Sequence, residues 1–261
     1  MMKQRQFFVP VPGTWVRSLL VVVALALAGC ASVKGTIDPR DPLERFNRGT
    51  FKVNDALDRG VAKPAAKAYR AVTPKFVRTG ISNVLSNAAY PTVIINDLLQ
   101  AKFKPAARDT GRLLLNSTLG LAGLLDPATA SGLEKNDEDF GQTLGRWGVP
   151  SGAYLVLPLL GPSSSRDAFG KVFDKGTEAT TYIGSSSTKY IVTAVSLLDK
   201  RTGLLDTDAL LERSGDKYAL IRSAYLQRRE YQVRDGEGSD APPEEMEDPG
   251  DTPPPDEPKQ P

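Results

Sequence analysis

The sequence contains no histidine and only one cysteine, Cys30. Histidine is the most common general base near neutral pH and a common transition-metal ligand, so its absence removes much of the usual equipment for catalysis and metal binding. A single cysteine excludes an internal disulfide and a metal cluster held by cysteines. We therefore expect a protein that is not an enzyme and that holds no metal and no other cofactor.

Short motifs of covalent or cation chemistry are also weak or missing. The chain has no Gly-x-Ser-x-Gly elbow and no phosphate-binding loop. Residues 186–189 and 214–217 both fit Ser-x-x-Lys, but the further motifs of a penicillin-recognising enzyme are absent. The acidic group at residues 134–139 lacks the spacing and the glycine of a calcium loop, so we interpret it as a solvated acidic loop.

Charge is distributed unevenly along the chain. The formal net charge is +2, yet residues 235–261 hold ten acidic residues and one lysine, a net of −9. Residues 30–234 carry +8, which suits an anionic partner such as phosphate head groups, nucleic acid or an acidic protein. The tail at 235–261 has eight prolines and almost no apolar side chain, so we expect it to be disordered.

The N-terminus has the pattern of an export signal. Lys3, Arg5 and Arg17 precede an apolar core at residues 18–28, which is too short for a stable anchor helix. The run ends in LAGC at residues 27–30, which resembles the lipobox of bacterial lipoproteins, where the cysteine thiol receives a diacylglyceryl group. The alternative is an ordinary signal peptide that ends in a cysteine by chance. We expect a signal peptide at 1–29 and lipid attachment at Cys30, followed by a linker to residue 40.

Residues 41–234 show helical periodicity and little strand-like alternation. Asp41 is placed to cap a helix, with Pro42 at its first position and Glu44 completing a capping box. A second helix is expected after Pro74, with Pro91 ending it. Further helical patterns are expected at 92–101, from about 105 to 126, and at 166–175, 188–199 and 207–232. The pattern predicts an all-α body.

Two stretches between the helices have a different character. Five glycines among acidic and polar residues predict a long loop at 128–152, and such loops are usually functional or mobile. The apolar run at 154–162 is interrupted by Pro158, so we expect a short extended or re-entrant piece there.

The apolar run at residues 113–125 has no charge but includes asparagine, serine, threonine and two glycines. At 13 residues it is shorter than the roughly 20 that a membrane-spanning helix needs. It is therefore either a buried core helix or a segment that enters a membrane only part of the way.

Several ordered segments resemble the MlaA (VacJ) family of outer-membrane phospholipid-transport lipoproteins. They include DPLERFNR at 41–48, RLLLNSTLG at 112–120, FGQTLG at 140–145 and YLVLP at 154–158, and the resemblance covers nearly all of residues 38–232. Ala153 departs from the family, which commonly has proline there. The acidic tail is not part of the shared pattern.

The resemblance implies an all-helical, ring-like lipoprotein embedded from the periplasmic side in the outer membrane, with an amphipathic channel. Such a protein removes mislocalised phospholipids from the outer leaflet and passes them to a periplasmic carrier protein. It also associates with trimeric porins and binds no nucleic acid. The alternative is a structural lipoprotein that scaffolds porins without moving lipid.

We expect the run at 113–125 to line or border the phospholipid path, because a channel must offer apolar wall to tails and polar wall to head groups. The glycine-rich region beside it is expected to act as a mobile loop through Gly141, Gly145, Gly148 and Gly152. The residues predicted for the path are Leu113, Leu114, Asn116, Thr118, Leu121 and Leu124.

Replacing Cys30 with alanine removes the thiol that accepts the diacylglyceryl group. We expect the variant to incorporate no labelled palmitate and to leave the membrane fraction, while Ser32→Ala, two residues away, behaves as wild type. Labelled Cys30→Ala protein would contradict the assignment of the lipobox.

Overall fold

The structure is a computed structural model that describes residues 39–182 and 184–236. The predicted signal peptide, the predicted lipid-attachment site Cys30 and the tail from residue 237 lie outside the described residues. The chain is mostly helical with one two-stranded sheet, which confirms the predicted all-α class. In chain order the elements are α2 Glu44–Leu57, η1 Asp58–Ala62, α3 Lys63–Val72, α4 Lys75–Leu99, α5 Phe103–Thr118, α6 Pro127–Ala130, α7 Phe140–Arg146, β1 Tyr154–Leu157, β2 Gly161–Ser164, α8 Ser165–Thr177, η2 Ala179–Thr181, α9 Ser186–Gly203, α10 Asp208–Arg213 and α11 Lys217–Val233.

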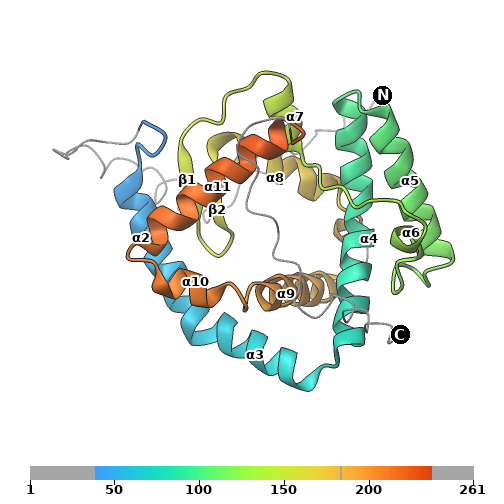
Figure 1. The fold of residues 1–261 in the computed structure, drawn as a ribbon, viewed down its shortest axis with the longest axis horizontal. Helices are drawn as coiled ribbons and strands as arrows, with labels where there is room; N and C mark the ends of the chain where they lie inside the picture. The colour runs from blue at the N-terminus through green and yellow to red at the C-terminus, as the bar shows by residue number, and fades with distance from the viewer. Residues whose placement is uncertain (1–38, 183, 237–261) are drawn as a thin grey trace, which may run out of the picture.

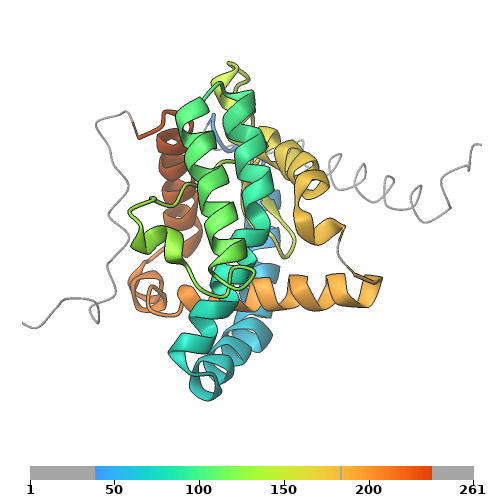
Figure 2. The same ribbon diagram turned by 90° about the vertical axis from the view of Figure 1, so that its right-hand side faces the viewer.

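The helices follow one another around a ring. In Figure 1, α2, η1 and α3 run down one side and along the bottom, α4 rises on the opposite side, and α11 closes the ring diagonally. Helix α5 packs antiparallel to α4 on the outside of the ring, which Figure 2 shows face on. Helix α9 lies just above α3 in Figure 1, where it is seen nearly end on, and it contacts both α3 and α4.

Helix α4 runs without interruption from Lys75 to Leu99, so the prediction that Pro91 ends it is wrong. A proline within a helix costs about 3 kcal/mol. Packing against α5 offsets this cost, because Tyr90 and Val93 on either side of the proline are buried and Asn87 Nδ2 donates to Ser117 Oγ at 3.0 Å.

Helix α5 ends at Thr118, eight residues before the predicted end. The chain turns back at Gly120, where an added Cβ would lie 2.5 Å from the carbonyl oxygen of Asn116, so only glycine fits. Leu121 and Ala122 follow in the left-handed region, with φ of 53° and 59°. Residues 119–126 therefore form an apolar loop and not the last turns of a helix.

The prediction of a loop over 128–152 is wrong for residues 127–130 and 140–146, which form α6 and α7. Asp139 caps α7 by accepting a hydrogen bond from the Gln142 backbone N–H at 2.9 Å. Gly141 lies where a Cβ would be 2.4 Å from Arg229 Nη2, so this glycine allows close packing of α7 on its neighbours. The prediction was wrong here because glycines such as Gly141 allow close helix packing and do not indicate a flexible loop.

The apolar run at 154–162 is extended, as predicted. Strands β1 and β2 pair antiparallel with Tyr154 opposite Ser164 and Leu157 opposite Gly161. Pro158 lies in the turn between them, where no ladder hydrogen bond is lost.

The predicted helices of the C-terminal half are largely confirmed. Ser164 Oγ accepts from the Asp167 N–H at 3.1 Å and caps α8. The helix predicted over 207–232 is divided into α10 and α11 at residues 214–216, where Asp216 caps α11. Asp235, placed in the disordered tail, instead pairs with Lys102 and Arg146.

Asp41 does not cap α2, because its buried carboxylate accepts three hydrogen bonds from elsewhere. The donors are Asn47 Nδ2 at 2.8 Å, Arg222 Nη1 at 2.9 Å and the Tyr218 hydroxyl. The segment before α2 is thereby fixed to α11, which lies about 180 residues further along the chain.

Two asparagines on one face of α2 bind the free edge of β1. Asn47 donates to Tyr154 O and accepts from the Val156 N–H, both at 2.9 Å. Seven residues later, Asn54 donates to Leu157 O and accepts from the Leu159 N–H, again at 2.9 Å. A spacing of seven residues places both amides on the same helix face, where they act as a second partner strand for β1.

Replacing Asn47 with alanine leaves a backbone N–H, a carbonyl and the Asp41 carboxylate short of partners in a buried site. We expect the free energy of unfolding to fall by about 2–4 kcal/mol, measured by urea denaturation in detergent. Lys52→Ala on the exposed side of α2 should change it by less than about 0.5 kcal/mol. Equal stability of the two variants would show that Asn47 does not join α2 to the hairpin.

Candidate functional site

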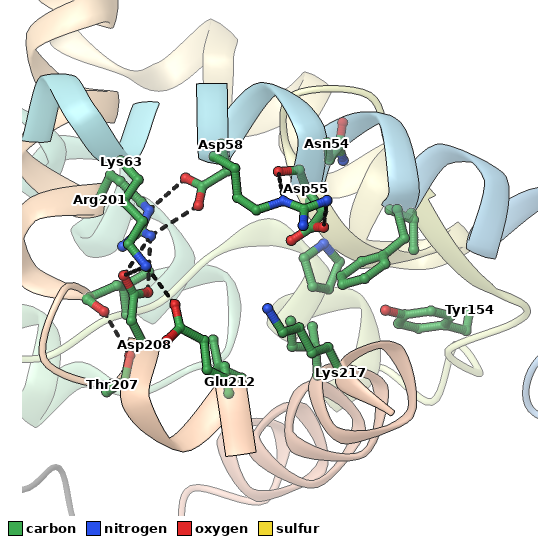
Figure 3. A pocket seen from close by; sticks show the side chains of 18 residues that line it. Asn54, Asp55, Asp58, Lys63, Tyr154, Arg201, Thr207, Asp208, Glu212 and Lys217 are labelled. Carbon is green, nitrogen blue, oxygen red and sulfur yellow. Dashed lines mark hydrogen bonds and ion pairs between the residues drawn. The ribbon is translucent and has the colours of Figure 1, made fainter. Parts of the chain in front are cut away.

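A cavity of about 450 Å³ lies between α2, the β-hairpin, the end of α9, α10 and the start of α11 (Figure 3). It is formed by segments from both ends of the described chain. Its lining residues are Phe51, Asn54, Asp55, Asp58, Arg59, Lys63, Tyr154, Val156, Gly161, Pro162, Arg201, Leu204, Thr207, Asp208, Leu211, Glu212, Lys217 and Ile221.

One wall of the cavity is apolar and rigid. Tyr154 and Val156 of β1 are buried there and pack with Tyr218, next to Phe51. The rings of Tyr154 and Tyr218 meet edge to face with centroids 6.2 Å apart. Leu211 and Ile221 continue this surface on α10 and α11.

The other wall holds a network of ion pairs. Arg201 binds Asp58 through Nε at 2.6 Å and Asp208 through Nη2 at 2.9 Å. Lys63 binds Asp208 at 3.0 Å and Glu212 at 2.7 Å. Figure 3 shows these side chains gathered on one side of the cavity, away from Tyr154.

The ion pairs keep the network charged. Hydrogen bonding to Asp58 raises the pKa of Arg201, although burial acts in the opposite direction. Burial alone would raise the pKa of Asp208, but hydrogen bonds from Arg201 and Lys63 outweigh it and the pKa is lowered. The cavity therefore combines an apolar wall with a charged wall, as a ligand with both an apolar and an ionic part requires.

The outer surface of the protein is unusually apolar. Among the described residues, 18 polar or charged residues are buried and only 10 apolar ones, whereas large apolar side chains are exposed on many elements. On α2 and η1, for example, Val53, Leu57 and Val61 are exposed. Exposed patches of this extent mark a surface that meets a membrane or another protein.

Of the six residues predicted for the phospholipid path, four lie on this outer surface, Asn116 is buried, and none is among those that line the cavity. Leu114 and Leu121 are 59% and 66% exposed, and Leu124 and Thr118 are also exposed. Leu113 is half-buried. The cavity residues that sequence analysis missed come from positions about 140 residues apart, and no local pattern joins them.

Asn116 and Arg112 fix the apolar loop at its base. Arg112 is fully buried and binds Asp126 through Nη2 at 3.0 Å, Tyr90 through Nε and the Leu133 carbonyl through Nη1. Asn116 Nδ2 also donates to Asp126, at 3.0 Å. These contacts connect both ends of the 119–126 loop to α5, so its leucines are presented outward by a rigid support.

Two of the four glycines predicted to make a mobile loop lie inside α7 and are packed. A Cβ on Gly145 would come within 2.9 Å of the Val233 side chain. Gly148 and Gly152 lie in the following segment with φ of 88° and 70°. Only this second pair lies in irregular structure.

The acidic group at 134–139 is not a fully solvated loop as predicted. Glu138 is buried and binds Lys102 at 2.7 Å, and Asp139 binds Arg229. Asn136 Nδ2 donates to the fully buried carboxyl groups of Asp97 and Asp109, at 3.2 and 3.0 Å. Among residues 39–182 and 184–236, no group of three or more acidic or cysteine side chains is arranged to hold a metal.

Comparisons with known proteins agree with this description. The family model for MlaA lipoprotein matches residues 39–232. The chain is 35% identical over 223 residues to an intermembrane phospholipid transport system lipoprotein MlaA from Haemophilus influenzae, covering 82% of this chain and 88% of the relative. It is 34% identical over 227 residues to the protein of the same name from Escherichia coli K12, covering 84% and 89%.

A solved structure also matches the fold. It comes from work on the structural basis for maintenance of bacterial outer membrane lipid asymmetry and superposes with a TM-score of 0.68 at 34% sequence identity. The match covers 74% of this chain and 98% of the solved one.

The helical ring with an apolar exterior and the match to the solved structure place this protein in the class of lipid-transport lipoproteins. The chain belongs to the MlaA lipoprotein family.

The Arg112–Asp126 contact gives a prediction with a defined pH dependence. Burial alone would raise the pKa of Asp126, but hydrogen bonds from Thr129 and Asn116 and the Arg112 charge lower it to about 2. A lowered carboxyl pKa stabilises the fold above its unfolded value near 4, and this contribution is lost as the pH falls toward 2.

Asp126→Asn should therefore lower the free energy of unfolding by about 2 kcal/mol at pH 7 and by about half as much at pH 3. Urea denaturation of both proteins at the two pH values measures this difference. An equal loss of unfolding free energy at pH 7 and pH 3 would show that the charge of Asp126 contributes nothing to stability.

Proposed function

We propose that this protein transports phospholipids at the outer membrane. In this proposal it takes mislocalised phospholipids from the outer leaflet and passes them to a periplasmic carrier protein, and so maintains lipid asymmetry. The observation that carries the proposal is the cavity, whose apolar wall suits acyl chains and whose charged wall suits a head group. The names of the relatives from H. influenzae and E. coli support it.

The physical need for such a cavity follows from the cost of exposing acyl chains. Each methylene moved from a bilayer into water costs roughly 0.8 kcal/mol, so a lipid with two chains meets a barrier of tens of kcal/mol. A protein surface that replaces the bilayer around the chains lowers this barrier. The ionic wall keeps the head group solvated by fixed charges during the same step.

The apolar exterior supports a position half-immersed in the membrane. No helix in the described part of the chain is long and apolar enough to cross a bilayer. Leucines 114, 119, 121, 124 and 125 form an exposed apolar edge at the α5 end of the ring, and Leu159 and Leu160 form another at the hairpin tip. We propose that these edges contact lipid, so that the run at 113–125 borders the path while the cavity forms it.

The segment at residues 147–153 is the proposed mobile element. It contains Gly148 and Gly152, whereas Gly141 and Gly145 belong to the packed helix α7.

The exposed apolar faces that do not meet lipid are proposed to contact trimeric porins.

The proposal includes no covalent chemistry. The only hydroxyl groups lining the cavity belong to Tyr154 and Thr207. Its carboxylates are held in ion pairs, and the pKa of Asp208 and of Glu212 is lowered, the latter chiefly by its hydrogen bond from Lys63. A general base near neutral pH requires the opposite shift.

Leu211→Arg places a charge on the apolar wall, so acyl chains should no longer enter. Expressed in a strain that lacks the gene, this variant should leave phospholipid in the outer leaflet at the level of the deletion strain. Leu210→Arg, on the adjacent exposed position of α10, should complement as wild type does. Outer-leaflet phospholipid is measured by modification of exposed ethanolamine head groups on intact cells.

Full complementation by Leu211→Arg would contradict transport through this cavity. A deletion strain with normal levels of outer-leaflet phospholipid would leave only the alternative function, a scaffold for porins.

A further inference from the structure

Lys217 differs from the other basic residues that line the cavity. Arg59, Lys63 and Arg201 each bind a carboxylate of the lining within 3.0 Å. Lys217 is half-buried and makes no ion pair or side-chain hydrogen bond with any residue that the structure describes. It is the first residue of α11, where the helix dipole disfavours a positive charge.

The charges around the cavity balance only when Lys217 is counted. The lining contains four carboxylates and four basic groups. Three basic groups are paired with the four carboxylates, so the paired network carries one negative charge in excess. The cavity thus combines an uncompensated carboxylate charge with an amino group that pairs with no described residue.

The carboxylates and the amino group of Lys217 line the same cavity. Figure 3 shows Lys217 next to Glu212, while Asp55 lies on the facing helix α2. Glu212 is held by Lys63 through one oxygen, Oε1, at 2.7 Å, and Asp55 is bound by Arg59 through Oδ2 at 2.8 Å. The second oxygen of each carboxylate remains available for a further donor.

We propose that the cavity selects phospholipids with a zwitterionic head group, in which Lys217 binds the phosphate and the carboxylates of Asp55 and Glu212 bind the ammonium. This inference rests on the proposed transport of phospholipids. An ammonium compensates the excess carboxylate charge, whereas an anionic head group without one leaves it uncompensated. Phosphatidylethanolamine is therefore favoured over phosphatidylglycerol with the same acyl chains.

The test is native mass spectrometry of the purified full chain in a detergent that is not a phospholipid. The protein is incubated with equal amounts of phosphatidylethanolamine and phosphatidylglycerol of identical acyl chains. We expect wild type to retain the ethanolamine lipid in about fivefold excess, as one favourable charge contact predicts. Glu212→Gln removes a carboxylate assigned to the ammonium and should lose this excess. Lys217→Glu should retain less of both lipids without losing the excess, and Lys217→Arg should behave as wild type.

Circular dichroism and a control variant distinguish a loss of lipid binding from a loss of folding. Glutamate at the first position of α11 favours the helix, so Lys217→Glu should fold as wild type by circular dichroism. Lys52→Glu, which makes the same charge change on the exposed side of α2 outside the cavity, should retain both lipids as wild type does.

Each unfavourable result identifies what is wrong. Equal retention of the two lipids by wild type, an unchanged excess in Glu212→Gln, or undiminished retention of both lipids in Lys217→Glu overturns the head-group assignment while leaving phospholipid binding in place. No retained lipid of either kind overturns the proposed function itself. Displacement of bound lipid by millimolar inorganic phosphate as effectively as by glycerophosphoethanolamine would show a simple anion site and would also overturn the proposal.

Discussion

The carboxylate of Asp41 joins three parts of the chain that are far apart in sequence. It binds Asn47 of α2 and both Tyr218 and Arg222 of α11, while Asn47 binds the backbone of β1. The same three elements form the apolar wall of the cavity. A buried carboxylate without these donors would cost several kcal/mol, so the ring closes only in the arrangement that satisfies them. The shape of the cavity thus depends on one polar contact beside it.

Polar contacts replace an apolar core throughout the molecule. Arg112 with Asp126, Glu138 with Lys102, and Arg229 with Asp139 and Asp167 each connect segments that lie at least 14 residues apart. Apolar side chains are left for the outer surface and for the cavity. Where an apolar surface faces lipid, its side chains gain little from burial in the protein, because they are already out of water. Paired charges also give the directional contacts that hold the helices of the ring together.

Much of the fold follows from the sequence, because helix periodicity and caps act locally. Helix α8, predicted at 166–175, and the extended piece at 154–162 are examples. The errors arose where long-range packing decides the local structure. Pro91 is accepted inside α4 because α5 covers it, and Gly141 lies in a helix because Arg229 and Asp167 pack against it.

The cavity was not predictable from sequence for the same reason. Lys63 and Asp208 carry no signal individually, and they meet only when α3 and α10 are brought together by closure of the ring. The composition of the apolar run at 113–125 predicted that it lines or borders the lipid path. The contacts of Arg112 and Asn116 place its exposed leucines on the outside of the protein.

The most direct test of the account is photocrosslinking of lipid inside the cavity in living cells. A photoreactive phenylalanine analogue at Ile221, which lines the cavity, should yield a phospholipid adduct detected by mass spectrometry after irradiation. The same analogue at Lys52, on the exposed side of α2 and outside the lining, should yield far less. A lipid adduct at Ile221 is the predicted result; crosslinks there to protein or water alone, with none to phospholipid, would contradict the central claim that this cavity carries lipid.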